Sequence, residues 1–75
     1  MSEIWVDVDV SKLRLDVAVR PLNEIWSMSN DQAGIKELTG KLKKLGPQRI
    51  VLEATGGYEY ELAFRLMKAG FACNL

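Results

Sequence analysis

The sequence contains no histidine and a single cysteine, Cys73, in 75 residues. One cysteine cannot form an internal disulfide, and the usual zinc sites need several cysteine and histidine ligands. Carboxylates are therefore the expected ligands of any metal ion in this chain. Cys73 lies in an apolar terminal segment, which favours a small buried side chain over a reactive thiol.

A net charge is also lacking, because ten basic residues balance ten acidic ones. This balance gives no global positive field, so any contact with nucleic acid must come from a local site. The apolar runs are far shorter than the roughly 20 residues that span a bilayer, and the chain does not open with a basic region followed by an apolar run. We therefore expect a cytoplasmic protein that makes no contact with a membrane.

Apolar and polar residues alternate in the first part of the chain. This period of two predicts strands over residues 4–10 and 13–20, joined by the polar turn Ser11-Lys12. Leu13 falls on the apolar face of the second strand. After a turn signal at residues 21–23, residues 24–28 predict a third strand. Three consecutive strands predict an antiparallel meander.

After the meander, apolar residues recur at the spacing of an α-helix. Ile35, Leu38, Leu42 and Leu45 predict an amphipathic helix that is capped by Ser29 or Asn30 and closed by Gly46. Residues 49–53 contain the continuous apolar run Ile50-Val51-Leu52, which predicts a strand buried on both faces and parallel to the first strand.

A second helix is predicted after the turn at residues 54–57, closed by Gly70, and a last strand begins at Phe71. The apolar face of this helix is expected to hold Tyr58, Leu62, Ala63, Leu66, Met67 and Ala69. The order of elements predicts an α/β fold, with a mixed sheet in which helix-strand-helix-strand follows the meander.

Two carboxylates end strands that we expect to be parallel neighbours. Asp9 ends the first strand and Glu53 ends the fourth. Open α/β sheets bind ligands at this carboxyl edge, and Mg²⁺ prefers oxygen ligands. The pair is therefore a candidate metal site for phosphodiester chemistry. Acidic residues at strand ends are also common on solvated surfaces, and their spacing does not separate the two interpretations.

These residues lie in segments that resemble the insertion sequence 110/1111 family of transposases. The resemblance runs through the whole chain and is most specific at Leu52-Glu53-Ala54-Thr55-Gly56-Gly57-Tyr58. It implies that residues 1–75 are the amino-terminal part of a RuvC-like nuclease domain with a ribonuclease H-like fold. In that family an Asp, Glu, Asp, Asp set holds the metal ions, and Asp9 and Glu53 match its first two members.

The resemblance further implies that the last two acids, and a carboxy-terminal transposase domain, lie downstream of this chain. The site for Mg²⁺ or Mn²⁺ would then be complete only in the longer protein, and residues 1–75 alone are expected to be inactive. The implied function is metal-dependent cleavage and joining of DNA strands in transposition of an insertion sequence. DNA and a guide-type RNA are the partners that the family implies.

Asp7 departs from the family pattern, which usually has glycine two residues before the first metal ligand. A second carboxylate on this strand face would either join the metal shell or disturb the protonation of Asp9 by repulsion. A solvent-facing side chain, or a decayed copy of the gene, explains Asp7 equally well.

Five residues near the two acids have both a functional and a structural interpretation. Ser11 and Lys12 are candidate contacts for a backbone phosphate, and a polar hairpin turn explains them equally well. Gly56 and Gly57 would let a phosphate approach the amino end of the second helix. A tight turn needs the same glycines, with Thr55 as the helix cap.

Two larger groups are expected to be structural rather than to bind nucleic acid. The aromatic residues are dispersed, which fits core and edge positions better than base stacking. They are Trp5, Trp26, Tyr58, Tyr60, Phe64 and Phe71. The basic residues around the end of the first helix fit a solvated surface. They are Lys41, Lys43, Lys44 and Arg49.

Two other functions fit parts of the sequence. An actin-like or sugar-kinase ATPase also begins with a strand hairpin that carries an aspartate. Here Val10-Ser11-Lys12 follows Asp9 without a glycine, which disfavours a close phosphate loop. A non-catalytic module would instead self-associate as a homodimer or higher oligomer through the edge of the last strand and an uncovered sheet face.

Overall fold

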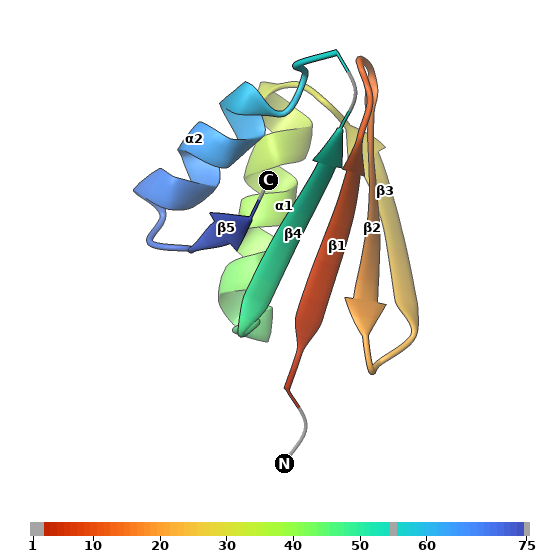
Figure 1. Cartoon of the computed structure of the whole chain (residues 1–75), viewed down its shortest axis with the longest axis vertical. Coiled ribbons are helices and arrows are strands. Elements are labelled where there is room, and N and C mark those ends of the chain that lie inside the picture. Colours follow the sequence, from red (N-terminus) through yellow and green to blue (C-terminus); the bar gives the residue numbers. More distant parts are fainter. Residues whose placement is uncertain (1–2, 55, 75) are drawn as a thin grey trace.

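The chain begins with the antiparallel meander that its alternating pattern predicts (Figure 1). The computed structural model describes residues 3–54 and 56–74. The meander consists of β1 (Trp5–Val10), β2 (Arg14–Arg20) and β3 (Glu24–Ser29). Val8 pairs with Val17 across β1 and β2, so that their side chains share one face. Leu13 lies in the turn before β2 and is 75% exposed, so its predicted place on the apolar strand face is wrong.

The second part alternates helices with strands that join the same sheet. It consists of α1 (Gln32–Leu45), β4 (Arg49–Ala54), α2 (Tyr60–Lys68) and the short β5 (Cys73–Asn74). β4 pairs parallel to both β1 and β5, which gives the strand order β3-β2-β1-β4-β5. The predicted mixed α/β sheet and the order of its elements are confirmed.

The core lies between one face of the sheet and the two helices, which Figure 1 shows side by side. The sheet contributes Val6, Val8, Val10, Leu15, Val17, Val19, Met28, Ile50 and Leu52. The helices contribute Ile35, Leu38, Leu42, Leu62, Ala63 and Leu66. All of them meet in one cluster, so α1 and α2 cover the same sheet face. Among the described residues no helix covers the opposite face, which is called the open face below.

This one-sided cover corrects the prediction for β4. Ile50 and Leu52 are buried, whereas Val51 is half-buried and Glu53 is exposed. The strand therefore alternates, and it is not buried on both faces as its continuous apolar run predicted. Val51 and Glu53 lie on the open face.

The start of α1 also differs from the prediction. Asp31, and neither Ser29 nor Asn30, is the N-cap, and its carboxylate accepts a hydrogen bond of 2.8 Å from the Gly34 amide. The Ser29 hydroxyl donates to the same oxygen at 2.8 Å. These bonds, with that from Gly34 the stronger cause, lower the pKa of Asp31. Gly46 ends the helix at φ 66°, as predicted.

The aromatic residues are more exposed than their pattern predicted. On and before α2, Tyr58 is 43% exposed, Tyr60 69%, Phe64 61% and Met67 67%. Trp5 is 45% exposed, and only Trp26 and Phe71 are partly buried against the core. The buried side of α2 is narrow, because the helix touches a single small core, so its larger side chains remain outside. Predicting Tyr58 and Met67 for that buried side was wrong, and of the aromatic residues predicted for core and edge positions, only Trp26 and Phe71 pack against the core.

The carboxy-terminal segment is close to its prediction. Ala69 caps α2 and Gly70 follows at φ 96°, while Cys73 in β5 is half-buried rather than fully buried. Burial raises the pKa of the Cys73 thiol, which keeps it protonated and unreactive near neutral pH. Neither described helix is long and apolar enough to cross a membrane.

Gly34 and Gly40 provide a matched test of how α1 packs on the sheet. A Cβ added at Gly34 would overlap the carbonyl oxygen of Ser29, whereas a Cβ added at Gly40 meets no atom within 4 Å. Gly34→Ala should lower the free energy of unfolding by about 1–3 kcal/mol, because an overpacked backbone must shift. Gly40→Ala should raise it by up to about 1 kcal/mol through helix propensity. Urea denaturation measures both values, and a stabilising Gly34→Ala would contradict the contact.

Candidate functional site

A row of carboxylates crosses the open face of the sheet. Asp9 near the end of β1 is the register partner of Glu53 on the parallel strand β4. On its other side Asp9 pairs with Asp16 on the antiparallel strand β2. Asp9 and Glu53 are both exposed. The sheet therefore brings together the two acids that the sequence singled out, and it adds a third.

The row borders a shallow depression of about 200 Å³. Its lining consists of the acids Asp7, Asp9, Asp16 and Glu53 and of Val17, Ala18 and Ile25. Carboxylate oxygens are the ligands that Mg²⁺ and Mn²⁺ prefer. However, no three Asp, Glu, Cys or His side chains of the described residues are grouped closely enough to hold a metal ion. The acids thus form an open row rather than a closed cluster.

Asp16 was missed when the sequence was analysed for site residues. The Arg14 guanidinium donates to Asp16 Oδ1 at 2.9 Å, and the Ser27 hydroxyl donates to the same atom at 3.2 Å. Chiefly because of the bond from Arg14, the pKa of Asp16 is lowered, so the group stays charged. A signal for it was present in part, because alternation places Asp16 on the same sheet face as Asp9. The predicted two-residue turn would set Asp16 opposite Asp7, and the observed pairing with Asp9 arises because Leu13 belongs to the turn.

Asp9 and Glu53 differ from Asp16 in their surroundings. Within residues 3–54 and 56–74, neither side chain takes part in a hydrogen bond or ion pair with another residue. The backbone of the sheet alone sets their positions. Their oxygens are therefore open to an external ligand, whereas Oδ1 of Asp16 already accepts two hydrogen bonds.

Asp7 lies on the same face as Asp9, one pleat earlier along β1. Its Oδ2 is 3.6 Å from Nε of Arg20, and its side chain is 32% exposed. The observed partner of Asp7 is thus an arginine at the far end of β2. A surface ion pair of this kind contributes little to stability, and a role of Asp7 in a metal shell stays a prediction.

The turn residues have local structural roles. The Ser11 hydroxyl donates to the Arg14 carbonyl at 3.1 Å and accepts from the Arg14 amide at 3.2 Å, while Lys12 is exposed. Gly56 and Gly57 have φ of 87° and 80°, a conformation that glycine adopts without strain. Thr55, the predicted cap, lies outside the described residues. These roles account for the turns, and phosphate contacts by any of these residues stay predictions.

Asn30 joins the two loops that follow the acids. Its side-chain amide donates to the Ser11 carbonyl at 2.8 Å and to the Tyr58 carbonyl at 3.3 Å. Its backbone amide donates to the Leu13 carbonyl at 3.0 Å. The loop after β1 and the loop after β4 are thereby fixed to the end of β3. Sequence analysis predicted Asn30 as a helix cap, because both roles use the same short amide side chain at a helix start.

No protein-family model and no curated protein matches this sequence. The choice of function therefore depends on the geometry of the sheet edge and on the motif residues found there.

Replacing Asn30 by aspartate should release the two loops. A carboxylate cannot donate to the Ser11 and Tyr58 carbonyls, so Asn30→Asp should lower the free energy of unfolding by about 1–3 kcal/mol. Amide hydrogen exchange should accelerate at residues 11–13 and 56–59 more than in the central strands. The same change at Asn23, in the exposed turn before β3, is the matched control. Equal exchange in the two variants would argue against this role for Asn30.

Proposed function

We propose that this chain is the amino-terminal part of a RuvC-like nuclease domain from a DNA transposase of the insertion sequence 110/1111 type. The proposed activity is cleavage and joining of DNA strands with Mg²⁺ or Mn²⁺. The observation that carries the proposal is the register of β1 and β4, which sets Asp9 beside Glu53 on an exposed sheet face. Both residues fall on the acids of the motif that the sequence resembles.

The fold supports the same proposal. An antiparallel meander followed by parallel strands, in the order β3-β2-β1-β4-β5, is compatible with a ribonuclease H-like domain. The specific motif begins in β4 and continues through Gly56 and Gly57 into the loop. Glu53 therefore lies on the strand and the glycines lie in the loop that follows, which is the strand-to-helix junction where the sequence placed this motif.

The charge of the row explains why a cation would bind there. Asp9 lies between Glu53 and Asp16 across the sheet, so three acidic side chains gather on one exposed surface. A divalent cation would be attracted to this surface, and Asp9 and Glu53 have open oxygens for it. Bound ions of this kind activate the attacking oxygen and stabilise the leaving oxygen in phosphodiester cleavage. The open face leaves room for a DNA backbone to approach.

Carboxylates are the right kind of ligand for such an ion, but residues 1–75 supply only part of the proposed set of four acids. Mg²⁺ sites commonly use one or two carboxylates together with waters and substrate phosphates. Asp9 and Glu53 supply the first two acids of the proposed set, and the proposal assigns the last two to a downstream part of the protein. Weak binding of the metal, and no cleavage, are therefore expected from residues 1–75 alone.

Manganese provides the first test, because its unpaired electrons broaden nuclear magnetic resonance signals near even a weak site. In the ¹⁵N-labelled chain, Mn²⁺ should broaden the amides of Asp9, Glu53 and their neighbours first. Asp9→Asn and Glu53→Gln should each raise the Mn²⁺ concentration needed by about 10-fold or more, since each removes a charged ligand. Glu37→Gln, at an exposed site on α1, should change nothing. Broadening that both site variants leave intact would exclude this metal site.

DNA cleavage tests the function itself. In the longer polypeptide that the proposal requires, Asp9→Asn and Glu53→Gln should each lower Mg²⁺-dependent strand cleavage by about 100-fold or more. Asp16→Asn should have a smaller effect, because Arg14 and Ser27 already occupy its Oδ1. Thermal unfolding should be nearly unchanged in the first two variants, whose side chains are exposed. Undiminished cleavage by either one would refute the assignment.

A further inference from the structure

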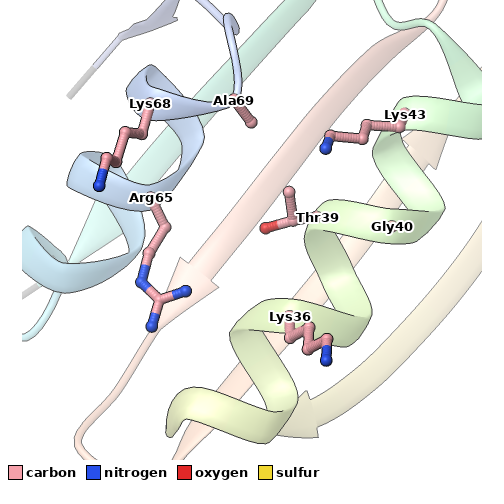
Figure 2. A pocket seen from close by; sticks show the side chains of 7 residues that line it. All are labelled: Lys36, Thr39, Gly40, Lys43, Arg65, Lys68 and Ala69. Carbon is pink, nitrogen blue, oxygen red and sulfur yellow. The ribbon is translucent and has the colours of Figure 1, made fainter.

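A basic groove lies in the helix layer, across the core from the carboxylates. It has a volume of about 470 Å³ and lies between α1 and α2. Its lining contains the cations Lys36, Lys43, Arg65 and Lys68, together with Thr39, Gly40 and Ala69. Figure 2 shows Lys43 and Arg65 extending into the space between the helices from opposite sides, with Lys36 and Lys68 on the bordering helix faces. None of the described residues that line it is acidic.

Helical spacing produces this arrangement. Lys36 and Lys43 are seven residues apart, with Thr39 and Gly40 between them on the same side of α1. Arg65 and Lys68 are three residues apart on α2 and therefore also share a side. At 1.5 Å of rise per residue, Lys36 and Lys43 stand about 10 Å apart along α1. The cations thus form two pairs, one on each side of the groove, and the spacing along α1 matches a chain of separated negative charges better than a single anion.

The four cations are available to a ligand. In the described part of the chain none of them forms a salt bridge, since the ion pairs there involve Arg14 and Arg20. The space above Gly40 is open, because an added Cβ would meet no atom within 4 Å. The Thr39 hydroxyl already donates to the Ile35 carbonyl at 2.7 Å. Recognition of an anion in the groove therefore depends on the cations alone.

Two exposed aromatic residues lie on α2 outside the groove lining, and one of them contacts a cation of the groove. Phe64 is 61% exposed, and Nζ of Lys68 lies 5.6 Å from the centre of its ring. Tyr60, one turn earlier, is 69% exposed. Exposed rings beside a basic groove are the combination that binds single-stranded nucleic acid, because the bases stack on the rings while the cations contact the phosphates.

We propose that this groove binds the backbone phosphates of a single nucleic-acid strand, either RNA or DNA. The binding uses none of the carboxylates of the open face, so it goes beyond the proposed nuclease function and does not depend on it. Arg65 contributes a planar fork that binds phosphate through two hydrogen bonds, and the lysines act as point charges along the strand.

Salt dependence of oligonucleotide binding measures the number of phosphates that the groove contacts. We suggest fluorescence anisotropy with labelled DNA and RNA of about 12 nucleotides and identical sequence. Four contacts predict a slope of log K against log salt of about −2.8, because each contributes about −0.7 for a single strand. Affinity should then fall by about 50-fold between roughly 50 and 200 mM salt. Tighter binding of RNA or of DNA identifies the source of the strand.

A pair of double variants separates the groove from general charge. Lys36→Gln with Lys43→Gln should bring the slope to about −1.4, and the fall in affinity over the same salt range to about 7-fold. Lys41→Gln with Lys44→Gln removes the same charge from α1 but outside this groove, and it should keep the original slope. All four side chains are exposed, so both variants should fold, which circular dichroism checks.

Several outcomes would overturn the proposal. They are the absence of saturable binding at low salt, an equal loss of slope in the two double variants, and binding to anionic lipid vesicles without binding to either oligonucleotide. The Asp9→Asn variant keeps the whole groove and should bind the oligonucleotides at least as well as the original chain. Failure of the manganese test would therefore leave this inference untouched, and the reverse also holds.

Discussion

The parallel pairing of β1 with β4 is the constraint on which the core and the candidate site both depend. Parallel neighbours cannot be joined by a tight turn, so the chain must leave the meander, form α1 and return on the covered face. The register that sets Val8 beside Leu52 in the core also sets Asp9 beside Glu53 on the open face. A slip of one residue would turn the acids of one strand inward. Burial of the valines thereby fixes the position of carboxylates that have no partners of their own among the described residues.

The elements could be predicted from the sequence because each has a strong period and clear end signals. Alternation identified β1 and β2, and helical spacing with Gly46 identified α1. The degree of burial could not be predicted in the same way, because it depends on how many layers cover an element. Val51 looked buried and is half-exposed, since no described helix covers the open face. Met67 looked apolar enough for the core and is outside it, since α2 buries only a narrow side.

For the site, the strand ends predicted Asp9 and Glu53. Alternation placed Asp16 on the same face, but its pairing with Asp9 depends on the length of the turn, which the sequence pattern did not give. Asn30 could not be found in this way. Its two side-chain bonds go to carbonyls at residues 11 and 58, which are distant along the chain and meet only when the sheet has formed. The N-cap of α1 was predicted at the wrong residue for a related reason. Ser29, Asn30 and Asp31 are all good caps, and the backbone conformation decides among them.

Four acids line the depression on the open face and four cations line the groove between the helices, so the zero net charge of the chain conceals two local surfaces of opposite sign. The molecule measures 35 × 23 × 21 Å, and each dimension exceeds the screening length of about 10 Å at 0.1 M salt. In the surrounding solvent, an ion near one face is therefore largely screened from the charges of the other face, so that one small chain of zero net charge presents two separate surfaces of opposite sign.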